Sequence, residues 1–255
     1  MVAVWRREHF TTGGGPGEIA LIALSPARLP DPLPVSRKQH GMPDEGEGAT
    51  AISLVARDRA EDPAWFVEQV VGPFAELIAS DLGPQLAATA LAAEHAYVIE
   101  GQLDDPDDLG HVQAAWALAK CVCEEGATIV IDVYAARAHL GSDIAALPPD
   151  RAFDVMHEVT LFFDETGDGT LAAWSLGLRK FGRPDIVVLD VAPDAATDTA
   201  LLLRDVAMTL AAGERIEPGD EVGAADGRRL VAKRFEAAAA PIVAVEGDAL
   251  VLGLA

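Results

Sequence analysis

The side chains that could do chemistry gather in one short stretch, Trp174–Asp185. Arg179, Lys180 and Arg183 are three of the chain's 19 cations, and they fall within a window of five residues. Guanidinium and ammonium groups bind carboxylates and phosphates. The cluster therefore indicates one of two structures: a site for an anionic ligand, or a turn whose cations neutralise carboxylates of the same chain.

A strand is expected directly before these cations, and one face of this strand carries only small residues. Residues that alternate along a strand share a face, so Ala173, Ser175 and Gly177 should lie together. Small side chains let a ligand or another backbone approach closely. His157 is a candidate neighbour of this face. The candidate ligand-binding residues are Ser175, Gly177, Arg179, Lys180 and Arg183.

Signatures of catalysis and metal binding are missing from the sequence. No histidine stands in an H-E-x-x-H spacing, and no serine stands in G-x-S-x-G. Asp164–Gly169 begins like a calcium loop, but Ser175 occupies the twelfth position, where the cation needs an acid. Cys121 and Cys123 diverge on an expected helix and are poorly placed to share a metal. We therefore expect no catalytic residue, no metal and no cofactor, and the sequence favours a protein that is not an enzyme.

The charge of the chain is strongly negative and uneven. Lys and Arg total 19 against 41 Asp and Glu, a net charge of −22. Such an excess repels phosphate backbones and anionic lipid, so we expect neither a nucleic acid nor a membrane as partner. The segment Ala60–Ala119 holds eleven acids and no Lys or Arg. It indicates either a solvated acidic surface or a docking face for a basic protein, whose association opposite charge would speed.

Features of secreted and membrane proteins are weak. Residues 1–10 carry charges where a signal peptide needs an apolar run. The apolar stretch Ile19–Leu24 is too short to cross a bilayer. Two cysteines do not make the disulfide framework of a small secreted protein. The sequence therefore predicts a cytoplasmic protein.

The first half of the chain predicts strands joined by helices. Asp62-Pro63 and Asp105-Pro106 each place an acidic N-cap before a proline, a pattern that begins helices. Gly72-Pro73 should kink or split the first helix, and Gly126 should end the second. The run strand–helix–strand indicates an α/β crossover. Strands are expected at 18–24, 51–56, 96–100 and 128–134, and the second of these is expected to be buried.

Hairpin strands predominate in the second half. The loop Asp164–Gly169 is rich in turn formers and should join the first two strands. A helix capped by Thr197 or Asp198 should carry an apolar stripe and end at Gly213. Strands are expected at 155–163, 170–178, 185–191, 229–235, 241–245 and 249–253.

Together these elements predict an α+β protein with a mainly antiparallel sheet and helices packed on one face. Residues 1–48, rich in glycine and proline, are expected to form a mobile N-terminal segment and a loop. An α/β half is expected over 49–145 and an α+β half over 154–255. The halves are either two units that meet near 140–153 or parts of one composite domain.

Part of the chain resembles an uncharacterised bacterial family, a domain of unknown function. Trp174, Gly177, Lys180-Phe181-Gly182 and Pro184-Asp185 are similar to its signature W-x-x-x-G-[LM]-x-K-F-G-x-P-[DE]-[IL], with one residue fewer after the tryptophan. Gly219–Gly223 resembles the family's downstream Gly-Asp-x-[IV]-Gly turn, and the resemblance covers about residues 154–225. Related domains resemble parts of bacterial toxin–immunity and regulatory neighbourhoods, which implies a binding role.

Two hypotheses on function follow. The leading one is a non-enzymatic binding module, immunity-like or regulatory, whose acidic surface over 60–119 recognises a basic partner protein. It rests on the uneven charge and on the missing catalytic motifs. The alternative is a small-molecule or anion-binding protein, or an enzyme, with its site around Arg179–Arg183.

Overall fold

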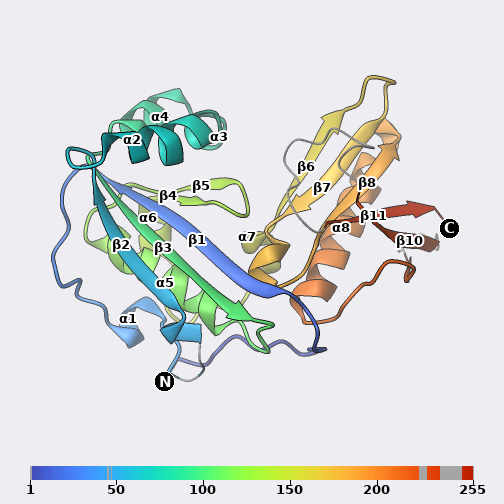
Figure 1. The fold of residues 1–255 in the computed structure, drawn as a ribbon, viewed down its shortest axis with the longest axis horizontal. Helices are drawn as coiled ribbons and strands as arrows, with labels where there is room; N and C mark the ends of the chain where they lie inside the picture. Colours follow the sequence, from blue (N-terminus) through green and yellow to red (C-terminus); the bar gives the residue numbers. More distant parts are fainter. Residues whose placement is uncertain (1, 45, 47, 224–228, 236–248, 255) are drawn as a thin grey trace. The chain divides into compact units, whose positions relative to one another are not determined.

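The computed structural model describes residues 2–44, 46, 48–223, 229–235 and 249–254. The chain divides into two compact units, each with its own sheet (Figure 1). Unit 1 comprises Met1–Arg6, Glu18–Leu103 and Asp108–Phe153. Unit 2 comprises Arg7–Gly17, Asp104–Asp107 and Asp154–Ala255. Helices and mainly antiparallel strands make up both units, which confirms the predicted α+β class.

Unit 1 contains a five-stranded sheet in the order β2-β3-β1-β4-β5. Its strands are β1 (Pro16–Ser25), β2 (Ile52–Asp58), β3 (His95–Asp104), β4 (Ile129–Asp132) and β5 (Arg137–Leu140). Because β1 lies between β3 and β4, helix α5 (Gly110–Glu124) carries the chain across β1 within one sheet. This is the predicted strand–helix–strand crossover.

Strand β1 is buried on both faces. Ile22 and Leu24 belong to a core with Phe66, Val70 and Ile78 from the helices that follow β2. Leu21 and Ala23, which alternate with them and point to the opposite face, are fully buried as well. By contrast β2 is an edge strand, and the prediction that it is buried is wrong: Val55 is 38 % exposed and Ser53 is exposed too.

The segment after β2 is a helix interrupted by a π-helical turn. It comprises α2 (Pro63–Phe66), the π-helix η2 (Val67–Val71) and α3 (Gly72–Leu82), and α4 (Pro84–Leu91) follows. The Asp62 carboxylate caps α2 by accepting a hydrogen bond from the Trp65 amide at 3.2 Å. Pro73 has no N–H, and the Gly72 amide donates to the Val67 carbonyl five residues back. The predicted split at Gly72-Pro73 is absent: a π-helical turn precedes these residues, and the helix continues through them as α3.

Helix α5 is buried on nearly all sides. It begins at Gly110, so the prediction that Asp105-Pro106 starts it is wrong. Strand β3 continues to Asp104, and the Asp108 carboxylate accepts a hydrogen bond from the Gly110 amide. Thirteen of the fifteen residues of α5 are buried. Its contacts include β2 and three short helices, α1 (Arg37–His40), η1 (Gly48–Thr50) and α6 (Gly141–Ala145).

Unit 2 contains a six-stranded sheet in the order β6-β7-β8-β11-β10-β9. The β8–β11 pair is parallel and the other pairs are antiparallel. Helix α8 (Ala196–Ala211) contacts β6, β7 and β8 through a buried stripe that includes Leu203 and Leu210. The strands are β6 (Thr160–Glu165), β7 (Leu171–Leu176), β8 (Asp185–Val191), β9 (Glu221–Gly223), β10 (Arg229–Arg234) and β11 (Ala249–Leu254).

Several predicted boundaries in unit 2 are wrong. Residues 155–158 form helix α7 (Val155–Glu158) and not a strand, because the Asp154 carboxylate caps the Met156 amide. Ala195 is the N-cap of α8, which follows the short helix η4 (Pro193–Ala195), so Thr197 and Asp198 lie inside its first turn. The strand expected at 241–245 lies outside the described residues.

Candidate functional site

The predicted basic cluster lies in a tight turn between β7 and β8. The turn is a 3-10 helix, η3 (Leu178–Phe181), with Gly177 and Gly182 on either side in left-handed backbone conformations, φ 118° and 63°. The predicted strand therefore ends at Leu176 and not at Leu178. A Cβ at Gly182 would stand 2.2 Å from the Gly15 carbonyl oxygen, so only glycine fits there. The Gly15 amide donates to the Gly182 carbonyl at 3.0 Å, which ties residues 13–17 to this turn.

Lys180 is not available to solvent. Its ammonium donates to Glu158 Oε2 at 2.8 Å, and both side chains have no exposed surface. Glu158 ends α7, and its other oxygen lies 3.3 Å from His157 Nδ1. His157 is therefore a neighbour of the cluster, as predicted, because it contacts Glu158, which in turn binds Lys180. Moving two charges from water into the interior is costly, and their pairing offsets that cost.

Ser175 and Asp185 close the turn from its two strands. The Ser175 hydroxyl donates to Asp185 Oδ1 at 3.0 Å and accepts from the Ile186 amide at 2.9 Å. The Leu178 amide also donates to Asp185 Oδ1, at 3.2 Å. Burial raises the pKa of Asp185 to about 7, although these hydrogen bonds and the charge of Lys180 act in the opposite direction.

Arg183 binds the N-terminal segment of unit 2. Its guanidinium lies 3.2 Å from Asp105 Oδ1 and also donates to the carbonyls of Thr11 and Gly213. Burial opposes ionisation of Asp105, but hydrogen bonds from the Gly13 amide and Arg183 more than offset this and lower its pKa. The contacts of Arg183 are therefore with groups of its own unit.

Arg7, which stands in no motif of the sequence, has the same kind of environment. Its guanidinium donates to the carbonyls of Pro106, Phe181, Leu210 and Ala211. Burial, followed by the charge of Arg183, lowers its pKa to about 10. Its partners lie about 100 to 200 residues away in sequence, so no local pattern could have revealed them.

The acidic segment Ala60–Ala119 differs from the basic cluster in the exposure of its charged side chains. Of its eleven acids, Asp104, Asp105 and Asp107 belong to unit 2 and the other eight to unit 1. Among those eight, Asp62 caps α2, and Asp108 accepts a hydrogen bond from the Gly110 amide at the start of α5. Two large apolar side chains of the same segment, Val67 and Leu86, are 57 % and 41 % exposed. The remaining six acids of unit 1 are exposed: Glu61, Glu68, Glu76, Asp81, Glu94 and Glu100.

The other motifs have structural roles. In the hairpin loop, the Asp168 carboxylate accepts hydrogen bonds from Thr166 and Thr170, which lower its pKa to about 2. Burial raises the pKa of Cys121 to about 11 and that of Cys123 to about 12, which makes both thiols unreactive. Among the described residues no group of three His, Cys, Asp or Glu side chains is arranged to hold a metal ion. No helix in the described ranges is long and apolar enough to cross a membrane.

Comparison with known proteins finds no matching family model, no matching curated protein and no matching solved structure.

Proposed function

We propose that this chain is a non-enzymatic binding module that recognises a basic partner protein, in an immunity-like or regulatory role. The observation that carries the proposal is the surface of unit 1 over residues 60–100. Its own residues include six exposed acids and no Lys or Arg, and the cations found against it include Arg57 of β2 and Arg59 directly after β2, which lie over Trp65 and Phe66. Charge of one sign on a surface speeds the encounter with an oppositely charged partner and repels other acidic proteins.

Exposed apolar side chains support this interpretation. Val67 lies next to Glu68 in η2, Glu76 and Asp81 lie in α3, and Leu86 lies in the following helix, α4. Apolar contacts surrounded by charge are typical of protein interfaces, in which the core excludes water and the charged rim sets specificity. The preferred partner surface is therefore basic, with a few apolar side chains.

The alternative, a site around Arg179–Arg183, has less support. Lys180 and Arg183 already bind Glu158 and Asp105 at hydrogen-bond distance. An external anion would have to displace these carboxylates. For Lys180 it would also have to reach a side chain with no exposed surface.

The test is capture of partners from a bacterial lysate by the immobilised full chain at low and high salt. A triple variant, Glu68→Gln, Glu76→Gln and Glu94→Gln, removes charge from the proposed surface. A matched variant, Asp150→Asn, Glu165→Gln and Asp194→Asn, removes the same charge from exposed positions elsewhere. We expect a basic protein that is captured at low salt, is released at high salt and is lost only with the first variant. Capture that is indifferent to salt, or lost equally with both variants, would contradict the proposal.

A further inference from the structure

The two edges of the unit 1 sheet differ in how they are covered. Strand β5 forms one edge; it is four residues long, contacts helix α3, and its Ala138 amide donates to the Asp81 carboxylate at 2.8 Å. Short edge strands and covering helices keep a sheet from pairing with another chain. Strand β2 forms the other edge (Figure 1). It has seven residues, contains no proline or lysine, and runs without a bulge.

Backbone groups of β2 point to its open edge. β2 pairs with β3 along its whole length, and the Arg59 amide continues the ladder by donating to the Glu94 carbonyl at 2.9 Å. In an antiparallel pair every second residue bonds to the neighbouring strand. Counting back from Arg59, Val55 bonds to β3, whereas Leu54 and Ala56 direct their N–H and C=O to the open edge. Among the described residues these outward groups of Leu54 and Ala56 have no hydrogen-bond partner.

One face of β2 is exposed to solvent. Ser53, Val55 and Arg57 alternate along the strand and share this face, and all three are exposed. Val55 is 38 % exposed. On β3, Glu100 lies opposite Ser53 and Val98 lies opposite Val55. The edge therefore combines free backbone groups with an exposed apolar side chain.

A second copy of β2 fits this edge by a two-fold rotation. In the antiparallel register that places Val55 opposite Val55 of the second copy, Leu54 lies opposite Ala56 of that copy. The outward groups of these residues then meet and form four main-chain hydrogen bonds. Val98 and Val55 of both copies form one apolar row across four strands. Cross-strand pairs of β-branched side chains stabilise a sheet.

The same register matches opposite charges. Ser53 lies opposite Arg57 of the second copy, and Glu100 is the next residue in this row, on β3. Because neighbouring strands are about 4.8 Å apart, the long Arg57 side chain can extend over Ser53 to the exposed Glu100 carboxylate of the other copy. Within its own chain Arg57 is 43 % exposed, and its guanidinium lies 4.0 Å from Asp62. The rotation forms the pair of Arg57 with Glu100 twice.

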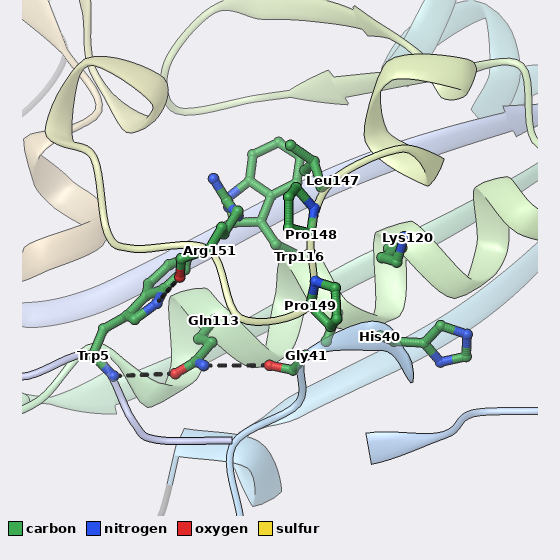
Figure 2. A pocket seen from close by; sticks show the side chains of 11 residues that line it. Trp5, His40, Gly41, Gln113, Trp116, Lys120, Leu147, Pro148, Pro149 and Arg151 are labelled. Carbon is green, nitrogen blue, oxygen red and sulfur yellow. Dashed lines mark hydrogen bonds between the residues drawn. The ribbon is translucent and has the colours of Figure 1, made fainter. Parts of the chain in front are cut away.

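The helix behind β2 is fixed by its own contacts. Helix α5 contacts β2, and Gln113 of α5 accepts from the Trp5 amide at 3.1 Å and donates to the Gly41 carbonyl at 3.3 Å (Figure 2). The pocket beside α5, whose lining includes Trp116 and Arg151, has a cavity of about 20 Å³, room for about one water. Packing this tight supports β2 before it pairs, and such preorganisation lowers the cost of association.

We propose that this chain forms a two-fold dimer in which the β2 strands of two copies pair antiparallel about Val55. The two five-stranded sheets of unit 1 then become one continuous sheet. The dimer does not depend on the proposed docking of a basic partner, and either proposal can fail without the other.

Analytical ultracentrifugation of the full chain tests the dimer. At about 0.15 M salt the charges outside the interface are screened beyond about 8 Å, so the net charge of −22 does not keep two copies apart. We expect the mass to rise toward that of two chains as the concentration increases, with a dissociation constant of about 100 µM or below. A chain that is still monomeric at about 500 µM would overturn the proposal.

A proline variant tests the role of the outward amides. Ala56→Pro removes one outward N–H and leaves the ladder with β3 intact, whereas the matched variant Ala56→Ser keeps this N–H. We expect Ala56→Pro to weaken dimerisation about 10-fold or more and Ala56→Ser to leave it unchanged. Circular dichroism verifies that both variants are folded. A dimer that the folded Ala56→Pro variant does not weaken would contradict the proposed pairing.

Disulfide formation tests the register. In Val55→Cys the two new thiols face each other across a pair whose Cα atoms are about 4.5 Å apart, which suits a disulfide. Ser53→Cys is the matched variant, because its two copies lie about 13 Å apart along the strands. The unsubstituted chain is the blank, since Cys121 and Cys123 are buried. We expect a covalent dimer after mild oxidation only with Val55→Cys. Equal cross-linking of both variants, or of neither, would refute the register about Val55.

Discussion

Charge is distributed in opposite ways in two regions of this molecule. Over residues 60–100 of unit 1, six acids lie on the surface, and Val67 and Leu86 of the same segment are exposed too. In the turn of unit 2 between β7 and β8, Lys180 and Arg183 are buried and bound to Glu158 and Asp105. Exposed charge costs little and is available to partners, whereas buried charge must be paired and then governs stability.

Among the variants that test this contrast, Lys180→Met should change the stability most. Removal of one member of a fully buried pair leaves the Glu158 carboxylate without its cation, and we expect a loss of about 3–5 kcal/mol in the free energy of unfolding. Urea denaturation measures it. The double variant Lys180→Met, Glu158→Leu should recover most of the loss, and Arg229→Met, at an exposed pair, should cost little. A loss below about 1 kcal/mol for Lys180→Met would show that the pair does not support the fold.

The glycine of the same turn gives the next largest effect. In Gly182→Ala the new methyl group would collide with the Gly15 carbonyl in addition to the cost of a positive φ, so we expect a loss of about 2–4 kcal/mol. Gly169→Ala is the matched control, because φ there is also positive, 85°, while no atom lies within 4 Å. Its loss should be about 1–2 kcal/mol, from backbone strain alone. Equal losses for the two variants would mean that residues 13–17 do not pack on this turn.

A smaller effect is expected in the pH dependence of the free energy of unfolding. The pKa of Asp185 is about 7 in the folded chain and near 3.9 in an unfolded one. Between these values the folded state binds more protons, so stability falls as pH rises from about 4 to 7 and then levels off. Because Asp185 keeps some exposure, we expect its contribution between pH 5.5 and 7 to be about 1 kcal/mol.

The comparison for this prediction is Asp185→Asn, which keeps an acceptor for Ser175 and Leu178 but cannot titrate. Urea denaturation of both proteins at several pH values isolates the contribution of Asp185. If the two stability profiles run parallel across this range, the carboxyl group is not protonated in the folded chain.

The smallest effect on stability is expected in the acidic region. Glu68→Gln, Glu76→Gln and Glu94→Gln replace exposed carboxylates, and each should change the free energy of unfolding by less than about 0.5 kcal/mol. Thermal unfolding measures this. A large destabilisation would show that these acids serve the fold and would weaken the proposed docking role.

Elements with strong local signals were predicted well from the sequence. The Asp62-Pro63 cap and the crossover through α5 are both present, and Gly72-Pro73 follows a π-helical turn in a helix that continues. Asp105-Pro106 carries the same local signal as Asp62-Pro63 but begins no helix, because Asp105 instead binds the Gly13 amide and Arg183. Asp154 likewise caps a helical turn within a stretch that reads as a strand. In both places a hydrogen bond of the acidic side chain, and not the local sequence pattern, determined the secondary structure.

The candidate site shows the same limit. Proximity in sequence grouped Ser175, Gly177, Arg179, Lys180 and Arg183, and the structure places them in one turn and its flanking strand. Their partners Glu158, Asp105 and Thr11 come from other parts of the chain. The pocket beside α5 was not predicted at all, because Trp5, His40, Trp116 and Arg151 share no spacing that marks them as neighbours.

By itself the sequence determined the α+β class, the net charge of −22 and the absence of cations from residues 60–119, since these depend on composition and short-range periodicity. The tertiary structure alone decided which charges face water and which are buried in pairs. It also brought two tryptophans and two cations together around one cavity in unit 1. The reason is physical: solvation and pairing depend on distance in space, and chain folding makes residues about 100 apart in sequence, such as Trp5 and Gln113, into neighbours.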